Sequence, residues 1–380
     1  MNDNYTLTAE SVTEGHPDKL CDTIADRVLD ACLRNDPNSR VACEVLATAG
    51  KILVAGEITT KEMPDIPHIV CKTVRDIGYD SSYEVEVITH DQSEDIAGAV
   101  DNPTAIGAGD QGIMYGYACH ETKELLPLPV VLAHRITRRL TVVRCSGRLP
   151  FLRPDGKAQV SVEYRNGQPY RVAAVVVSCQ HEAEISMGEL QNAVREQVLD
   201  PSFFDFPLDA NTMILINPSG KFVLGGFDAD TGLTGRKLMV DTYGGLVPHG
   251  GGALSGKDGT KVDRSGAYMA RYIAKNIVFA GLAKECTVTL AYAIGKAEPV
   301  AVEVDTQGTG RYPDSVIKKS LPIVFDLTPT GMMMILRLNE PIFANFCNYG
   351  HFTHKSAPWE QTDCADLLWE ACAMAAEGLA

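Results

Sequence analysis

Residues 41–58, VACEVLATAGKILVAGEI, decide the fold of the first part of the chain. Apolar residues alternate with other residues on both sides of Ala49-Gly50, a dipeptide suited to a two-residue hairpin loop. Glu44 and Glu57 then share one face, diagonally placed on neighbouring strands. There they could hold a cation or an ammonium group, or be solvated strand charges. The alternation puts a second set on the buried face: Val41, Cys43, Val45, Ile52, Val54 and Ile58.

The flanking segments extend this hairpin into a larger unit. Pro17 suits a first helical position, and apolar residues every four positions from Leu20 to Cys32 predict an amphipathic helix that begins just after His16. A second helical segment runs to about Gly78, and YEVEVIT, residues 83–89, is typical of a strand. The resulting order is hairpin, helix, strand.

The same order returns twice along the chain. The second hairpin turns at Asn166-Gly167 and is followed by a helix at 190–199 and a strand at 213–217. The third has strands at 287–294 and 300–304, a helix at 315–325 and a last strand, MMMILRL, at 332–338. Three such repeats predict an α+β fold of three related domains, because hairpins are packed under helices. A doubly wound parallel sheet would instead need strands and helices to alternate singly.

Candidate boundaries between the domains fall near Asn102-Pro103 and Gly225-Gly226. They divide the chain into 1–102, 103–225 and 226–380. The segment DQSEDIAGAVDN, residues 91–102, is polar and has no periodicity. It is either a mobile loop over a site or a plain linker.

Composition limits the partners and the compartment. The chain of 380 residues is 45% hydrophobic and carries a formal net charge of −15, which argues against nucleic acid or anionic lipid as partners. It has no leader-like N-terminus and no apolar window long enough to span a bilayer, so we expect a cytoplasmic protein. Eleven cysteines without a C-x-x-C pair fit reduced thiols.

The stretch HGGGALSGKDGTKVDRS, residues 249–265, has the character of a phosphate cradle. Glycines let backbone N–H groups approach an anion, while Lys257 and Lys261 supply positive charge. The pattern G-x-x-x-x-G-K is satisfied up to Gly256-Lys257, but Asp258 stands where a Ser or Thr hydroxyl would meet magnesium. We therefore expect polyphosphate chemistry on a different scaffold.

A second charged motif, ESVTEGHPDK at residues 10–19, surrounds the expected helix start. His16 and Lys19 could flank an anion drawn to free N–H groups, and Asp18 could hold magnesium. The ordinary alternative is that Asp18 only caps the helix.

Two further motifs are weaker when taken alone. GAGDQG, residues 107–112, formally matches a dinucleotide fingerprint, but a strand follows it rather than a helix, so a tight turn is the better interpretation. In GGFDADTGLTGRK, residues 225–237, Arg236 and Lys237 at a strand start could clamp phosphates, or one of them could be solvated. No Ser-His-Asp, Cys-His or zinc-ligand spacing emerges.

Taken together, these motifs resemble the methionine adenosyltransferase (S-adenosylmethionine synthetase) family nearly from end to end. The likeness is carried by ESVTEGHPDK, GAGDQG, GLTGRK with VDTYGG, the cradle at 249–265, and the late YAIG and YGHF segments. The resemblance implies three similar α+β domains related by pseudo-threefold symmetry. It also implies the synthesis of S-adenosylmethionine from ATP and L-methionine, followed by hydrolysis of the bound triphosphate to phosphate and pyrophosphate.

The resemblance further implies roles for individual residues. His16 matches a contact on the leaving side of ATP, and Asp18, less firmly Asp263, match magnesium ligands; Glu44 matches a potassium site. The residues that match triphosphate-holding catalytic positions are Lys157, Arg236, Lys237 and Lys257, with Lys261 beside them. The residues that match the family's other ATP-binding positions are Asp110, Asp155, Gly156, Lys221, Phe222, Asp230 and Ala253. Methionine contacts match Glu57, Gln92, Asp230 and Lys261.

The family likeness also bears on assembly and on the loops. It implies a site shared between two subunits, so we expect a homodimer or homotetramer, and it assigns 91–102 to a gating loop. Five residues depart from those frequent in the family: Phe227, Asp228, Thr231, Gly259 and Glu94. Two other functions stay open, a polyphosphate hydrolase that does not use methionine and an ATP-binding regulator without activity.

Overall fold

The computed structural model describes residues 4–93, 101–102 and 105–378. Its first unit follows the predicted order, with a hairpin closed by Ala49-Gly50 and a last strand parallel to the second hairpin strand. All six residues predicted for the buried face of the hairpin are buried, which confirms that prediction. The unit consists of α1 (Pro17–Asn35), β2 (Arg40–Thr48), β3 (Lys51–Thr59), α2 (Ile66–Ile77) and β4 (Glu84–His90).

The second unit repeats this topology. Its hairpin turns at Asn166-Gly167, where both residues have positive φ as the predicted tight turn requires. The last strand again runs parallel to the second hairpin strand. The elements are α4 (Leu128–Cys145), β8 (Leu152–Arg165), β9 (Gln168–His181), α5 (Met187–Val194), a π-helical turn (Arg195–Leu199), α6 (Asp200–Ser202) and β10 (Met213–Ile216).

The third unit ends differently from the prediction. Residues 332–338 do not form a strand, because Thr328 caps a helix by accepting the N–H of Gly331 and Pro329 occupies its first turn. Met332 and Leu336, four residues apart, are both buried against the core. The elements are α8 (Val262–Phe279), β12 (Glu285–Tyr292), β13 (Ala301–Asp305), α9 (Asp314–Val324), α10 (Pro329–Ile335) and α11 (Ala365–Ala376).

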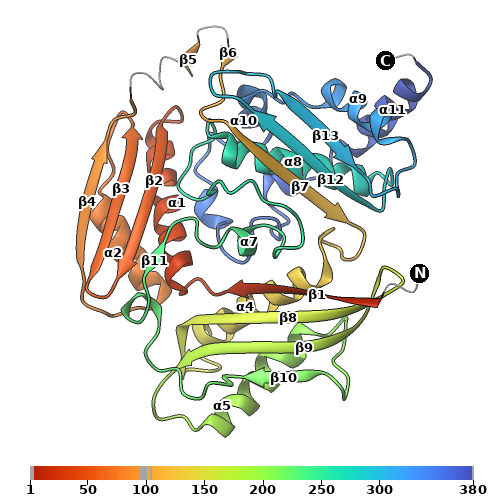
Figure 1. Ribbon diagram of the computed structural model, residues 1–380. Helices are drawn as coiled ribbons and strands as arrows, with labels where there is room; N and C mark the ends of the chain where they lie inside the picture. The colour runs from red at the N-terminus through yellow and green to blue at the C-terminus, as the bar shows by residue number, and fades with distance from the viewer. Residues whose placement is uncertain (1–3, 94–100, 103–104, 379–380) are drawn as a thin grey trace.

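Each sheet also takes an antiparallel strand from elsewhere in the chain. β1 (Asn4–Val12) pairs with β8, β7 (Gly112–Cys119) pairs with β12, and β11 (Gly232–Leu233) pairs with β2. Each of the predicted ranges 1–102, 103–225 and 226–380 therefore supplies one strand to the sheet of another range. We keep these ranges as a proposed division of the chain into domains. A short ribbon of β5 (Asp101–Asn102) and β6 (Ala105–Ile106) lies apart from these sheets (Figure 1).

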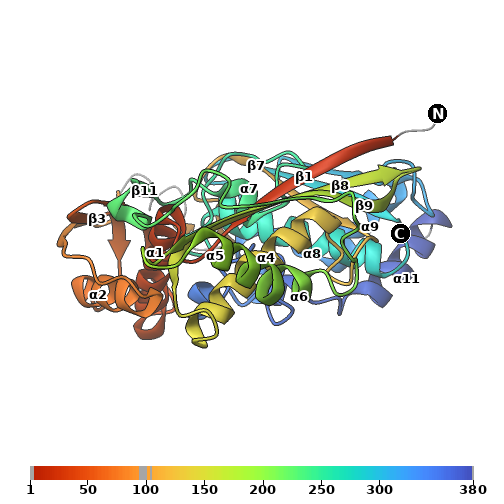
Figure 2. The ribbon, with the colours of Figure 1, turned by 90° about the horizontal axis from the view of Figure 1, so that it is seen from below.

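The long helices α1, α2, α4 and α8 lie on one side of the three sheets (Figure 2). One apolar core unites the first and third units, and a second fills the space between β8, β9 and α4. The opposite sheet faces carry exposed apolar side chains, among them Ile88, Ile113, Met213 and Leu215. This architecture confirms the predicted α+β class with three similar domains and mixed sheets.

The remaining described helices are short: η2 (Gly226–Asp228), α7 (Leu238–Asp241), η3 (Phe343–Asn345) and η4 (Pro358–Glu360). Among the helices that the structure describes, none has both the length and the apolar character needed to cross a membrane. All eleven cysteines lie in described residues, and all are free thiols.

Candidate active site

His16 lies at the point where β1 turns into α1. It is the N-cap of α1, and its Nδ1 accepts the N–H of Asp18 at 3.2 Å. Burial lowers the pKa of His16 to about 3, and the positive charges of Lys237 and Lys157 add to this effect. The imidazole is therefore neutral at pH 7. Because Nδ1 accepts a hydrogen bond, we assign the ring proton to Nε2, which is then a donor.

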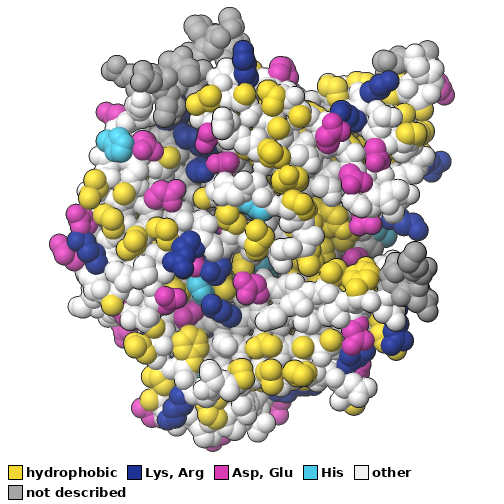
Figure 3. All heavy atoms as spheres, viewed as in Figure 1, with side chains coloured by type: hydrophobic (Ala, Val, Ile, Leu, Met, Phe, Trp, Pro, Cys, Tyr) yellow, Lys and Arg dark blue, Asp and Glu magenta, His cyan; other side chains and the backbone are white. Residues whose placement is uncertain are grey.

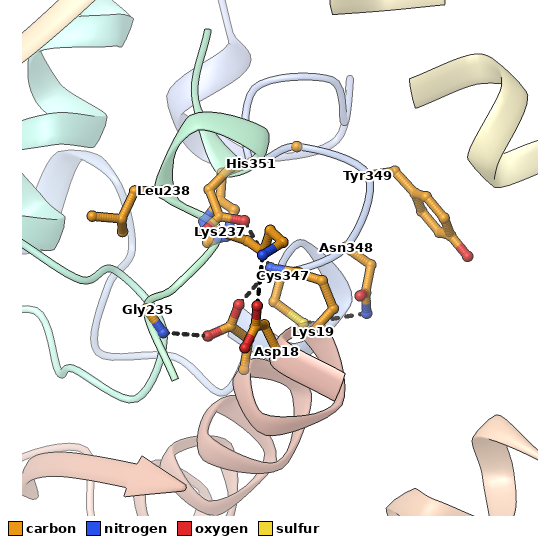
Figure 4. Close-up of polar contacts among 12 residues, drawn as sticks. Asp18, Lys19, Gly235, Lys237, Leu238, Cys347, Asn348, Tyr349 and His351 are labelled. Atoms are coloured by element: carbon orange, nitrogen blue, oxygen red, sulfur yellow. Dashed lines mark hydrogen bonds and ion pairs between the residues drawn. The ribbon is translucent and has the colours of Figure 1, made fainter. Parts of the chain in front are cut away.

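Asp18 joins α1 to the Arg236-Lys237 segment (Figure 4). Its Oδ2 accepts Lys237 Nζ at 2.6 Å, its Oδ1 accepts the Leu233 N–H at 3.0 Å, and Arg236 Nε lies 3.7 Å away. Burial opposes ionisation, but the hydrogen bonds of Lys237 and Leu233 outweigh it and hold the pKa of Asp18 below its usual value. The carboxylate is charged and lies among cations.

The Arg236-Lys237 pair does not begin a strand as expected. It lies between β11 and α7, so the two side chains are not forced to opposite faces of a sheet. Lys237 is mostly buried on Asp18, whereas the side chain of Arg236 is about half exposed, and its Nη1 donates to the Thr231 carbonyl at 3.1 Å. One cation is thus fixed and the other faces outward.

Lys19 does not flank the site as predicted. It is fully buried, and its Nζ donates to Asp22 at 2.9 Å and to Asp241 at 2.7 Å. Burial opposes its charge, but these two carboxylates raise the pKa of Lys19 above its usual value. Its ammonium pairs with these two carboxylates of the protein and is not left to bind a substrate anion.

The cradle at 249–265 places its two lysines on two different aspartates. Lys257 Nζ lies 2.6 Å from Asp263 Oδ2, and Lys261 Nζ lies 2.7 Å from Asp258 Oδ2. Asp258 also accepts the Val41 N–H at 2.7 Å and is buried, so it fastens the loop to β2. Its oxygens are thus taken up by contacts within the protein.

Glycines shape the cradle by close approach. Gly256 has φ +80, and a Cβ there would lie 2.1 Å from the Cys43 carbonyl oxygen. At Gly252 a Cβ would lie 2.1 Å from Asp263 Oδ1. The chain can therefore wrap β2 and Asp263 tightly only with glycine at these positions.

A pocket of about 260 Å³ opens beside Lys257. Glu57 and His90, partners in the β3–β4 register, form part of its wall, with Glu57 Oε1 and His90 Nε2 3.3 Å apart. The sequence did not single out His90, although its place at the end of a strand, two residues before Gln92, was the available signal. The lining is Arg40, Ala42, Glu57, His90, Asp91, Gln92, Ser93, Gly109, Asp110, Lys257, Lys261 and Asp263.

Glu44 lies on the same face of the hairpin as Glu57 and diagonally from it, as predicted, since Glu44 pairs with Ala55 and Glu57 with Ala42. Burial raises the pKa of Glu44, with Lys257 lowering it and Asp22 and Glu57 raising it further. The Lys257 ammonium thus acts electrostatically on Glu44 while its hydrogen bond goes to Asp263.

Asp155 lies where β8 passes the His16 turn, and its neighbour Gly156 accepts the Thr13 N–H at 2.9 Å. Its Oδ2 accepts the Gly226 N–H at 2.8 Å, but Oδ1 is buried and has no partner among the described residues. Burial raises the pKa of Asp155 to about 6. A buried acceptor of this kind can take a hydrogen bond from a water or a bound ligand.

Other residues assigned to ATP border this region. Phe222 is fixed by two hydrogen bonds with His181, from His181 N to its carbonyl and from its own N–H to Nε2. Lys221 Nζ donates to the Ala183 carbonyl at 3.3 Å, and Asp230 is exposed. Ala253 packs on Gly235, where a Cβ would lie 2.5 Å from the Ala253 Cβ.

The site residues thus form two groups at different points along β2. Leu233, which donates to Asp18, pairs with Leu46, whereas Lys257 forms a bridge with Ala42 of the same strand. Four residues of strand separate these points, about 13 Å. The first group contains His16, Asp18, Asp155, Lys157, Arg236 and Lys237; the second contains Glu57, Asp110, Lys257, Lys261 and Asp263.

Within the described residues, no three His, Cys, Asp or Glu side chains form a ready-made metal cage. Magnesium commonly uses one or two carboxylates and completes its shell with water and substrate phosphates. Asp18 and Asp263, one in each group, fit that kind of binding. Most of the predicted gating loop, 91–102, lies outside the described residues.

Fold and site together define a three-domain α+β protein with two cation-bearing loops, one of which borders a small pocket lined by side chains of both charges. Three family models match this chain: the N-terminal domain of S-adenosylmethionine synthetase at residues 4–98, the central domain at 105–222 and the C-terminal domain at 224–361. The chain belongs to the S-adenosylmethionine synthetase family. Membership supports a transferase role in S-adenosylmethionine synthesis.

Proposed function

We propose that this protein is a methionine adenosyltransferase that transfers the adenosyl group of ATP to the sulfur of L-methionine. The observation that carries the proposal is the pocket beside Lys257, where Glu57 and Lys261 place opposite charges on one wall. An amino acid offers an ammonium and a carboxylate, so it fits a pocket with an acid and a cation. Gln92 and Asp230 are assigned to the same substrate.

The reaction needs alignment more than proton transfer. The methionine thioether attacks the ribose C5′, the S–C5′ bond forms, the C5′–O5′ bond breaks, and triphosphate leaves with the electron pair. The sulfur has no proton to lose, which explains a site without a general base. His16, neutral and with Nε2–H free to donate, is suited to hydrogen-bond the leaving side of the triphosphate.

Cations from both groups then hold the leaving polyanion: Lys157, Arg236, Lys237 and Lys257. Their fixed charges stabilise negative charge as it develops and keep triphosphate in place while water attacks phosphorus, giving phosphate and pyrophosphate. Asp110, Asp155, Gly156, Lys221, Phe222 and Ala253 are assigned to the nucleotide. Magnesium, held by Asp18 and Asp263, supplies further neutralisation of the phosphates, and potassium is assigned to Glu44; members of the family generally use both ions.

We also propose that the working unit contains at least two copies. The two groups of site residues are about 13 Å apart along β2 in one chain, and apolar side chains gather over the uncovered sheet faces (Figure 3). A two-fold pairing through these faces would bury Ile88 and Ile113 and bring the first group of one copy to the second group of another. Full activity in a protein that stays monomeric at micromolar concentration would contradict this. A cytoplasmic location is kept as part of the proposal.

The test is direct. The protein is incubated with ATP, L-methionine, magnesium and potassium, and the sulfonium product, phosphate and pyrophosphate are measured by mass spectrometry and ion chromatography. The proposal expects all three in equal amounts. Triphosphate cleavage without the sulfonium product would favour the hydrolase, and binding of ATP without any turnover would favour the regulator.

A further inference from the structure

Helix α1 carries four buried aspartates, Asp18, Asp22, Asp26 and Asp30, at four-residue intervals. This spacing puts them on one face of the helix, one turn apart. Each accepts at least one backbone N–H from the last part of the chain: Leu233 for Asp18, Gly235 for Asp22, Gly256 for Asp26, and Phe343 and Ala344 for Asp30. We call these four residues the carboxylate row.

Asp22 holds the segment that carries Arg236 and Lys237. Its Oδ1 accepts the Gly235 N–H at 2.9 Å, directly before that pair in sequence. Its Oδ2 accepts Lys19 Nζ at 2.9 Å, and Lys19 also binds Asp241 in α7, just after the pair. The segment is therefore fastened to α1 on both sides of its two cations.

Asp26 holds the cradle in the same way. Its Oδ1 accepts the Gly256 N–H at 2.8 Å, and its two oxygens accept Arg264 Nη1 and Nη2, each at 2.7 Å. Arg264 Nη1 also donates to the Lys257 carbonyl at 3.1 Å. The backbone on both sides of the Gly256–Lys257 peptide is thus fixed by one buried, charge-assisted pair.

The two anchor points are joined by a second buried chain of contacts. Arg264 Nε donates to Tyr268 Oη at 3.0 Å, and Tyr268 Oη contacts His351 Nδ1 at 2.7 Å. The backbone N–H of His351 donates to the backbone carbonyl of Asp241 at 2.8 Å, and the Asp241 carboxylate accepts Lys19 Nζ. The two loops of one chain are therefore connected to each other through α1 and again through this series of contacts.

We propose that Asp22 and Asp26 are positioning residues: Asp22 fixes the Arg236-Lys237 segment and Asp26 fixes the Lys257 loop before the triphosphate binds. They contact loop backbone and buried cations, not the pocket lining. Preorganised charges stabilise a leaving polyanion only when their positions are fixed before it forms. This inference rests on the proposed function for the identity of the polyanion.

The carboxylate row contains its own matched control. Asp30 accepts two backbone N–H groups at 2.9 Å, from Phe343 and Ala344, neither of which belongs to a phosphate loop. Replacing Asp by Asn leaves one acceptor oxygen where two served, so each of Asp22→Asn, Asp26→Asn and Asp30→Asn must give up part of its contacts. Only the first two changes loosen a phosphate loop.

The experiment measures binding of inorganic tripolyphosphate, with magnesium, to the intact protein by titration calorimetry, beside Tm, kcat and the KM for methionine. We expect Asp22→Asn and Asp26→Asn to weaken tripolyphosphate binding and lower kcat at least tenfold, with the KM for methionine within twofold of the wild type. For Asp30→Asn, we expect tripolyphosphate affinity, kcat and the KM for methionine to stay within twofold of the wild type. This should hold even if its Tm falls as far as the Tm of Asp22→Asn and Asp26→Asn.

Tripolyphosphate affinity that equals the wild-type value in all three variants, or that falls by the same factor in all three, would overturn the inference. Where an Asn variant does not fold, Arg264→Lys replaces it, because lysine keeps the charge opposite Asp26 but cannot make the paired bonds and the Lys257 carbonyl bond together. It should show the same loss. A wild type that binds tripolyphosphate but makes no sulfonium product would defeat the proposed function and leave this test intact.

Discussion

Lys237 Nζ lies 2.6 Å from Asp18 Oδ2, so the ammonium that we propose for triphosphate binding forms an ion pair with the carboxylate that we propose for magnesium binding. Lys257 and Asp263 repeat this relationship in the second group, also at 2.6 Å. On the proposed assignment, a metal that binds either carboxylate would compete with its lysine and leave that ammonium available for a phosphate oxygen. In the free protein, both lysines proposed for phosphate are therefore paired with the carboxylates proposed for magnesium.

Removing the lysine should expose the carboxylate to metal. We predict that Lys237→Met binds magnesium about tenfold more tightly than the wild type in the absence of nucleotide, because an ammonium no longer competes for Asp18. Titration calorimetry measures this affinity. The control Lys318→Met removes an exposed lysine that pairs with Glu303. Equal magnesium affinity in Lys237→Met and the control would contradict the competition.

Replacing Lys257 should lower kcat far more than it changes the affinity for methionine. We predict that Lys257→Ala retains methionine affinity within about threefold but loses about 100-fold or more in kcat, as expected when one preorganised charge is taken from a developing polyanion. Steady-state kinetics and methionine titration give the two numbers. Unchanged turnover would remove Lys257 from the leaving-group role.

His16 should carry no charge at physiological pH. Burial lowers its pKa to about 3, and Lys237 and Lys157 favour the neutral ring further. We predict that ¹⁵N NMR of the imidazole shows the neutral Nε2–H tautomer from pH 8 down to pH 5, with the signal assigned through His16→Gln. Titration of this ring near pH 6.5 would contradict the donor role that we give it.

Asp155 makes stability depend on pH in a defined direction. Its folded pKa of about 6 lies above the unfolded value of 3.8, so its contribution to stability is complete below pH 3.8 and is lost as pH rises through 6. Asp155→Asn keeps an acceptor for Gly226 without a charge. Between pH 4 and 7, this variant should therefore gain about 2 to 3 kcal/mol in unfolding free energy relative to the wild type. Urea unfolding measures this, and a difference that does not change with pH would show that the carboxyl is ionised throughout.

Local patterns predicted the hairpins because alternation and turn residues act over a few positions. The same reasoning wrongly predicted a strand at 332–338, because a run of apolar residues has no periodicity that separates a strand from a helix. Thr328 and Pro329 begin a helix there. It could not predict the strands that the sheets exchange, since β1 pairs with β8 more than a hundred residues away. Such pairing depends on the whole fold.

For the site, glycine-lysine motifs indicated the phosphate loops, but not which charges meet. The motif predicts that Lys19 flanks an anion together with His16, but neighbouring helical residues point in different directions and Lys19 turns toward Asp241. The row at Asp22, Asp26 and Asp30 was visible as a four-residue spacing. Its burial against distant backbone was not.

The central claim is that the sulfur of methionine becomes bonded to C5′ of the ribose. ATP labelled with ¹³C at C5′ is incubated with the protein, methionine, magnesium and potassium, and the product is followed by ¹³C NMR. The account predicts that the labelled carbon moves from an oxygen-bonded to a sulfur-bonded resonance while phosphate and pyrophosphate appear. A labelled carbon that stays bonded to oxygen while the triphosphate is cleaved would contradict it.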